Sequence, residues 1–202
     1  MIEAYTAADV RAAEEPFLAR ERSFHGGLMH RAATALAGQV RAELRARGHH
    51  VYGATVVGLV GPGNNGGDAL HALALLAGRG VRATAVLTTT TVHDEGLAAL
   101  RAAGGRAVSV APDGGQDAIG AEVWSGDALA EAFAADVVLD GLLGIGGRGG
   151  LRGAAAVLVE RLQALNDGAP AAARPVVVAV DLPSGTGADD GTVPGPVLHA
   201  DV

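Results

Sequence analysis

The sequence predicts an α/β protein, a Rossmann-like three-layer α/β/α sandwich with a mostly parallel sheet and an N-terminal helical extension. Three observations lead to this fold class. From about residue 51 onward, short apolar runs alternate with segments of helical periodicity, as βαβ units require. The apolar runs end at glycine or aspartate and lack a polar face, so helices should cover both sides of the sheet. The first 50 residues contain two helical segments and no strand.

The N-terminal extension is expected to contain two helices. The first covers residues 5–22, begins at Thr6 as a suitable N-cap, and contains Pro16, which can bend or break it. The second covers residues 26–50 and stops near a glycine. Its apolar side chains are spaced four apart along one helical stripe, formed by Leu28, Ala32, Leu36, Val40 and Leu44.

The α/β body should then alternate strands and helices. Each expected strand is a short apolar run bounded by turn residues, over 54–61, 81–89, 106–110, 136–144 and 173–185. The expected helices are amphipathic segments over 67–80, 93–105, 128–135 and 151–167, with a loop over 112–127. Parallel strands bring their carboxyl ends to one edge of the sheet, where we expect ligands to bind.

The chain is expected to form a single domain over residues 1–202. Residues 1–50 make a helical preface and residues 51–202 the α/β body, without internal repeats. Residues 193–202 resemble the approach to a further strand. We therefore expect either a very short last strand or a domain that is truncated here at its C-terminus.

Composition excludes several classes of function. The net charge is −7 without a basic run, so binding to nucleic acid or to an anionic membrane by bulk electrostatics is not expected. The sequence contains neither cysteine nor lysine, which excludes thiolate chemistry, a Schiff-base lysine and a P-loop. No apolar run approaches the ~18 residues of a membrane span, and no leader precedes the first helix. A soluble cytoplasmic protein is expected.

Two glycine loops match the pattern G-x-G-x-x-G, over residues 61–66 and 144–149. Both follow an apolar strand and precede a helix, a context in which backbone N–H groups can cradle a phosphate. Tight turns without a ligand are the alternative. A dinucleotide dehydrogenase should also carry an acid about 20 residues further on. The segment found there, 86–91, is Val-Leu followed by four threonines, so this is not a standard NAD fingerprint.

Polar side chains with oxygen atoms follow three of the predicted strands. Asn64, Asn65 and Asp68 follow the first, Asp140 ends the fourth, and the last ends at Asp181 with Ser184 close behind. In a parallel sheet these side chains converge on one edge. Single aspartates at such positions are commonly N-caps or turn formers, but three sites together favour a ligand. Their hard oxygen donors suit an alkali or alkaline-earth cation rather than a transition metal.

Histidine and serine chemistry is not indicated. The seven histidines form no H-E-x-x-H pattern, and we assign them surface or core roles. Ser184 lacks the G-x-S-x-G frame of a hydrolase nucleophile, because position 182 is leucine.

Four motifs together resemble those of a known family. The stretches GPGNNGGDAL, LDGLLGIGGRGGLRG and VAVDLPSGTGADDG, with LMHRAA upstream, are similar in wording and order to the YjeF N-terminal family, the NAD(P)H-hydrate epimerases. The second loop is most similar to bacterial forms in which this domain is fused to an ADP-dependent dehydratase. Such a fusion would account for the C-terminal truncation.

The resemblance implies a role for each matching residue. The expected substrate-binding residues come from both glycine loops and the last strand: Asn64, Asn65, Gly66, Gly67, Asp68, Gly144, Ile145, Gly146, Gly147, Arg148, Gly149, Gly150 and Asp181. Asn65, Asp140 and Ser184 would ligate one potassium ion per subunit. Asp181 or Asp68 would be the catalytic acid and base, and the sequence leaves that choice open.

The resemblance also implies the reaction. The substrate would be NADHX or NADPHX, a reduced nicotinamide nucleotide hydrated at C6, whose R and S forms the enzyme interconverts in metabolite repair. An ADP- or ATP-dependent NAD(P)HX dehydratase would be the functional partner, and a homo-oligomer is expected. Two alternatives stay open: an NAD(P)-dependent reductase, and a non-catalytic nucleotide-binding or interaction module.

Overall fold

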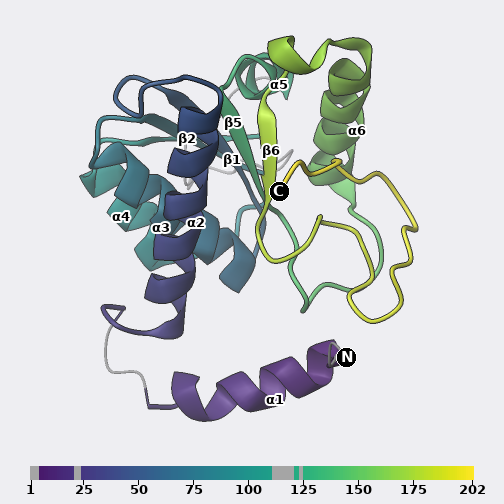
Figure 1. The fold of residues 1–202 in the computed structure, drawn as a ribbon. Coiled ribbons are helices and arrows are strands. Elements are labelled where there is room, and N and C mark those ends of the chain that lie inside the picture. The colour runs from purple at the N-terminus through teal and green to yellow at the C-terminus, as the bar shows by residue number, and fades with distance from the viewer. Residues whose placement is uncertain (1–4, 21–23, 111–120, 123–124) are drawn as a thin grey trace.

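The computed structural model describes residues 5–20, 24–110, 121–122 and 125–202 (Figure 1). Its centre is a six-stranded parallel sheet in the order β4-β3-β2-β1-β5-β6. The strands are β1 (Thr55–Val60), β2 (Arg82–Leu87), β3 (Arg106–Ser109), β4 (Ala121–Glu122), β5 (Val137–Gly141) and β6 (Val176–Ala179). The helices are α1 (Ala7–Leu18), α2 (Leu28–Ala46), α3 (Asn64–Ala77), α4 (Asp94–Ala102), α5 (Ser125–Phe133) and α6 (Gly153–Gly168), with a 3₁₀ turn, η1 (Ala171–Ala173). The predicted α/β fold class and parallel sheet are confirmed.

Helices cover both faces of the sheet, as the uninterrupted apolar strands require (Figure 1). On one face, α2, α3 and α4 bury one core cluster; on the other, α5 and α6 bury a second. Successive residues of β1 divide between the two, since Val56 belongs to the first cluster and Val57 to the second. Both clusters consist mostly of alanine, valine and leucine, which allows close helix-on-sheet packing.

The order of the strands reverses at β1. The chain runs from β1 outward to β4 on one side, then crosses to β5 on the other side of β1. The connections after β1 and after β5 therefore leave in opposite directions and open a crevice at the carboxyl end of the sheet. This switch point is where an α/β sheet of this kind binds its ligand.

The second helix shows a difference from the predicted stripe. Its buried residues are Ala33, Ala37, Val40 and Leu44, whereas Ala32 is exposed. A strict spacing of four residues advances about 40° around the helix at each step, because a turn holds 3.6 residues. The alternating spacing of four, three and four keeps the buried side chains on one face.

Other boundaries differ at the ends of elements. Helix α3 begins at Asn64, three residues before the predicted start, so its first turn is formed by the glycine loop itself. Within the predicted loop 112–127 the structure has β4 beside β3 and the start of α5; residues 111–120 and 123–124 lie outside the described part. Helix α1 continues through Pro16 to Leu18, and the Thr6 capping box confirms the predicted N-cap.

Residues near the C-terminus run along the free edge of β6. The Ala179 N–H donates to the carbonyl of Val202 at 2.8 Å, and the Val202 N–H donates to Val177 at 3.2 Å. This is the pattern of a parallel pair, and it agrees with the predicted approach to a further strand. No helix in the described ranges is long and apolar enough to cross a membrane.

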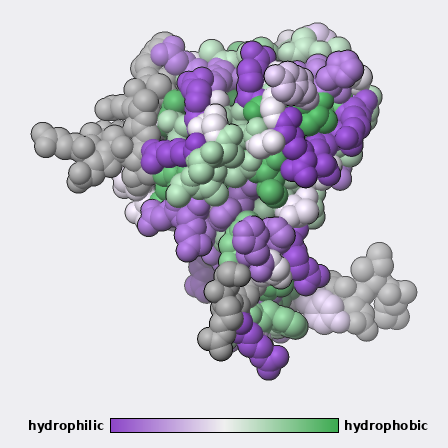
Figure 2. Space-filling model, turned by 90° about the vertical axis from the view of Figure 1, so that its left-hand side faces the viewer, coloured by the Kyte–Doolittle hydropathy of each residue, from purple (hydrophilic) through white to green (hydrophobic). Residues whose placement is uncertain are grey.

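Helix α1 differs from the other helices. It lies apart from the layered body, below the carboxyl edge of the sheet in the view of Figure 1. In the perpendicular view it forms the narrow lower lobe, whose surface mixes hydrophobic and hydrophilic residues (Figure 2). Among its residues only Ala7 is buried.

Candidate active site

A cleft of about 800 Å³ opens at the switch point between β1 and β5. One wall is the carboxyl edge of the sheet, formed by the loops after β1, β5 and β6. Helices α1 and α2 form the opposite side. The polar side chains that line this cleft are Arg11, Glu14, Asn64, Asn65, Asp68 and Asp181.

Glycines in the first loop allow the backbone to pack without side chains. A Cβ atom at Gly61 would overlap the Leu142 carbonyl, and one at Gly66 would overlap the carbonyl of Gly61. The first turn of α3 therefore lies directly against the end of β1. This close approach explains the glycines and places Asn65 and Asp68 at the sheet edge.

Asn65 and Asp181 reach the same point of the second glycine loop. A Cβ atom placed on Gly144 would lie 2.9 Å from Asp181 Oδ2 and 3.0 Å from Asn65 Oδ1. The Asn65 Nδ2 group is buried and has no hydrogen-bond partner among the described residues. A buried donor of this kind is costly unless a ligand satisfies it.

Asp181 is held in an unusual backbone conformation. Its φ is +74°, a left-handed region that is uncommon for residues other than glycine and that concentrates at functional sites. The carboxylate is exposed, and its Oδ2 accepts a hydrogen bond of 2.8 Å from the Ile145 N–H. Asp181 thus ties the turn after β6 to the loop after β5.

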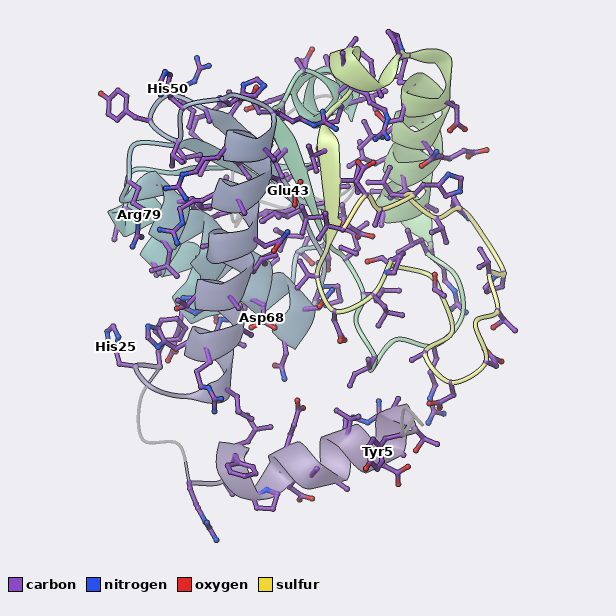
Figure 3. The ribbon with its side chains drawn as sticks, in the orientation of Figure 1. Tyr5, His25, Glu43, His50, Asp68 and Arg79 are labelled. Carbon is purple, nitrogen blue, oxygen red and sulfur yellow. The ribbon has the colours of Figure 1, made fainter. Side chains whose placement is uncertain are left out.

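Asp68 lies on the first turns of α3, at the edge of the body that faces α1 (Figure 3). Burial raises the pKa of its carboxyl group to about 7, and the neighbouring charges of Asp181 and Glu14 act in the same direction. Its Oδ1 atom is buried without a hydrogen-bond partner in the described part of the chain. Asp68 can therefore exchange a proton near neutral pH, as a general acid and base must.

Asp140 and Ser184 form a buried pair beneath the cleft. Both are fully buried, and Asp140 Oδ2 accepts a 2.8 Å hydrogen bond from the Ser184 N–H. The Ser184 hydroxyl accepts from the Leu143 N–H at 2.8 Å and lies 3.1 Å from the Leu143 carbonyl, to which it donates. Burial raises the pKa of Asp140, while hydrogen bonds from Ser184 and Leu142 lower it.

The predicted cation ligands fit a large monovalent ion in their chemistry. Asp140 supplies a buried carboxylate with no basic side chain bonded to it among the described residues. Ser184 and Asn65 supply neutral oxygens, and the Asn65 backbone carbonyl lies 3.3 Å from the Cβ position of Gly141, next to Asp140. Hard neutral oxygens with a single carboxylate suit a weakly charged cation better than a transition metal.

Only the first half of the second glycine loop faces the cleft. Gly144 through Gly147 line it, whereas Arg148, Gly149 and Gly150 are not among its lining residues. Gly150 packs instead against the backbone of Gly195. In the first loop, Gly66 and Gly67 are buried behind the cleft wall, and a Cβ at Gly67 would meet His93 and Met29.

Two charged residues at the cleft, Arg11 and Glu14, were not predicted as site residues. Both belong to α1, and Arg11 Nη1 donates a 3.1 Å hydrogen bond to the carbonyl of Ile145 in the second glycine loop. A charged residue on an exposed helix looks the same in sequence whether it faces solvent or a ligand. The sequence therefore held no signal for their position.

The histidines do not form a metal centre in the described part of the chain, where no group of three or more His, Asp or Glu side chains could hold an ion. Three of them lie against Phe24 instead, His25, His30 and His71, and His93 contacts the ring of His71. His71 is buried, and its ring stacks on Phe24 with centroids 3.9 Å apart. Burial lowers the pKa of His71 to about 4, so the ring is neutral at physiological pH.

Comparisons with known proteins agree with this arrangement. Residues 25–202 match the family described as YjeF-related protein N-terminus. The chain is 46% identical to an NAD(P)H-hydrate epimerase of Microbacterium testaceum, over 100% of this chain and 68% of that protein. It is 42% identical to an NAD(P)H-hydrate epimerase of Clavibacter sepedonicus, over 98% and 77%.

Longer relatives and a solved structure extend the comparison. A bifunctional NAD(P)H-hydrate repair enzyme, Nnr, of Mycobacterium tuberculosis is 41% identical over 97% of this chain, which spans 35% of that protein. The crystal structure of yeast ynu0 matches with a TM-score of 0.72 at 19% identity, over 98% of this chain and 78% of that one. At that identity the likeness supports the fold alone.

Proposed function

The chain belongs to the family of YjeF-related protein N-termini, and from that premise we propose that it is an NAD(P)H-hydrate epimerase. It interconverts the R and S forms of NADHX and NADPHX, an isomerase activity in nicotinamide cofactor repair. The observation that carries the proposal is Asp68, an acid with a pKa of about 7 in the switch-point cleft beside two further carboxylates.

The reaction needs one acid and no redox chemistry. The hydrated carbon C6 carries a hydroxyl group and is bonded to the ring nitrogen. When Asp68 gives its proton to that hydroxyl, the nitrogen lone pair expels water, the C6–O bond breaks, and the ring becomes a planar cation. Water then adds to either face of C6 and returns a proton to Asp68, so atoms and charge balance. A group with a pKa near neutrality suits both directions.

The surrounding residues stabilise the cation and position the ring. Asp181 and Glu14 place negative charge at the cleft, which favours a positively charged intermediate over its neutral precursor. Asn64 and Asn65 offer amide groups, and the backbone of the second loop faces the nucleotide along Gly144–Gly147. The hydrogen bond from Ile145 to Asp181 keeps the second loop in place. Asp68 is the proton donor in this proposal, and Asp181 a positioning residue.

We further propose one potassium ion per subunit, held by Asn65, Asp140 and Ser184. When bound, such an ion supplies positive charge that compensates the buried Asp140 carboxylate. The support is that carboxylate, which is fully buried and accepts hydrogen bonds from the backbone N–H groups of Ser184 and Leu142, with no basic side chain bonded to it among the described residues. Rubidium-soaked crystals should give anomalous density at these three residues. Density only elsewhere would contradict the assignment.

The alternatives are less well supported. A reductase would need an acid for the ribose after β2, and that position holds Thr88, whose hydroxyl donates to the Val60 carbonyl. A non-catalytic module would not need a half-buried acid with a pKa near 7 in its cleft. We also propose that the protein is cytoplasmic and homo-oligomeric and that residues 1–202 form one domain. Because longer relatives are named bifunctional repair enzymes, we propose a dehydratase as its functional partner.

The test couples the chain to an S-specific, ATP-dependent dehydratase. Pure R-form NADHX is incubated with both enzymes, and NADH is followed by its absorbance. We expect the chain to accelerate recovery of NADH from the R form in proportion to its concentration. Recovery no faster than with the dehydratase alone would contradict the proposal. Parallel runs with NADPHX measure the preference between the two substrates.

A further inference from the structure

The acidic side chains of the cleft conflict with the negative charge of the substrate in the proposed function. The substrate is a dinucleotide whose phosphates are negative, but three acidic side chains line the cleft, those of Glu14, Asp68 and Asp181. The chain as a whole also has a net charge of −7. Without a nearby cation the phosphates would be repelled from this end of the molecule.

Among the described residues that line the cleft, Arg11 is the only basic one. It lies on α1, and its Nη1 atom is bonded to the carbonyl of Ile145 and sits 3.8 Å from the Cβ position of Gly146. The side chain is thus held over the second glycine loop. A guanidinium has five N–H donors in a planar fork that matches phosphate geometry, and this contact uses one edge.

Helix α1 is fixed in the position that this role requires. Its N-terminus is closed by the capping box of Thr6 and Asp9. The Ala7 N–H donates a 2.6 Å hydrogen bond to Asp189 Oδ1, in the loop that follows β6. The contacts of Ala7 and Arg11 attach α1 to two of the loops at the carboxyl edge of the sheet, those after β6 and β5.

We propose that Arg11 is the phosphate-binding residue of the cleft and that α1 is one wall of the substrate site. The proposal rests on the proposed function, because that function makes the ligand a dinucleotide phosphate. The region that matches the family begins at residue 25, so this wall lies outside it. Arg11 and Glu14 are one helical turn apart, so one face of α1 presents a cation to the phosphates and a carboxylate to the ring.

The experiment measures binding without turnover. Wild-type chain, Arg11→Gln and Arg11→Lys are titrated with ADP-ribose, with 2′-phospho-ADP-ribose and with adenosine, which has no phosphate. Arg20→Gln is the matched control, because Arg20 is exposed, follows α1, and does not line the cleft. Gln at position 11 removes the charge and keeps a polar side chain.

We expect Arg11→Gln to weaken binding of the phosphate-bearing probes about 5- to 20-fold, as for a charged hydrogen bond that is partly solvated. Arg11→Lys should recover part of that affinity, and Arg20→Gln should change it less than about twofold. Adenosine affinity should stay the same in all variants, which separates a phosphate contact from a loss of α1 docking. A loss confined to 2′-phospho-ADP-ribose assigns the contact to the 2′-phosphate; an equal loss for both assigns it to the pyrophosphate.

Unchanged affinity of Arg11→Gln for both phosphate probes overturns the proposal. So does a loss of the same size in Arg20→Gln, or a wild-type chain that binds neither probe. The readout does not depend on epimerisation. If wild type binds ADP-ribose through Arg11 but fails the coupled dehydratase assay, the proposed function is wrong and the phosphate site stands. If the assay succeeds and Arg11→Gln binds normally, only the phosphate site is wrong.

Discussion

The two walls of the cleft are built in opposite ways. The wall at the sheet edge consists of buried strand ends and glycine loops that touch backbone to backbone, as at Gly61 and Gly66. The wall formed by α1 is an exposed helix, attached through Arg11 and the Ala7 N–H (Figure 1). The sheet-edge wall holds its side chains in a desolvated environment, whereas α1 presents charged side chains to solvent.

This difference has a chemical consequence. Burial penalises the charged form of a carboxyl group and can raise its pKa by several units, and the sheet edge provides such a place for Asp68. A long basic side chain can recognise a phosphate, and an exposed helix such as α1 carries one without burying its charge. We therefore expect substitutions in the sheet-edge wall to affect catalysis and folding, and substitutions in α1 to affect affinity and the pH profile.

The largest expected effect is the loss of epimerisation rate when a residue of the sheet-edge wall is substituted. Asp68→Asn removes the proton donor and should lower the rate of epimerisation about 10²–10⁴-fold while ADP-ribose binding is retained. Single-turnover NMR of the R to S conversion measures the rate. The control is Asp94→Asn on the exposed start of α4, which should keep wild-type activity. Activity of Asp68→Asn close to wild type would move the proton transfer to Asp181.

The second prediction concerns folding of the sheet-edge wall. Gly66→Ala places a Cβ against the Gly61 carbonyl, so α3 must shift away from β1, at a cost of roughly 1–3 kcal/mol or more. Gly38→Ala in α2 is the matched control. Its Cβ has open space apart from one ordinary contact, and it should stabilise the helix by about 0.5–1 kcal/mol. Urea denaturation compares them, and equal destabilisation would contradict the packing described.

The third prediction concerns the buried pair below the cleft. Asp140→Ala leaves the Ser184 N–H buried without its acceptor, which should cost about 1–3 kcal/mol in the free energy of unfolding. Asp140→Asn keeps an acceptor oxygen and should lose less. In the wild type, exchange of sodium for potassium should raise the melting temperature, and Asp140→Ala should not respond. A response that survives in Asp140→Ala would place the ion elsewhere.

The smallest expected effect is that of a residue on α1 on the pKa of a residue at the sheet edge. Glu14 on α1 contributes to the raised pKa of Asp68, after burial and Asp181. Glu14→Gln should therefore lower the midpoint of the pH dependence of kcat/KM slightly, and Asp181→Asn should lower it more. Glu15→Gln, one residue further along α1 and outside the cleft lining, is the control. A larger shift from Glu14→Gln than from Asp181→Asn would reverse this ranking.

Much of the sheet-edge wall could be predicted from the sequence, and so could α1 as a helix, but its position at the cleft could not. Apolar runs that end in Asp140 or Asp181 require buried parallel strands, and parallel strands bring these residues to one edge. The contact between Asp140 and Ser184 and the shared approach of Asn65 and Asp181 to Gly144 follow from that topology. The place of Arg11 depends on how an exposed helix docks, through contacts that leave no periodic pattern.

The central claim is that Asp68, protonated near neutral pH, donates the proton for epimerisation. The most direct measurement is the pH dependence of kcat/KM for conversion of R-form NADHX to the S form, followed by NMR and corrected for the uncatalysed reaction. Because the protonated acid is the active form, we expect a plateau at low pH and a fall of about tenfold per pH unit above a midpoint near 7. A profile that stays flat through that midpoint, or that Asp68→Asn leaves unchanged, would contradict the claim.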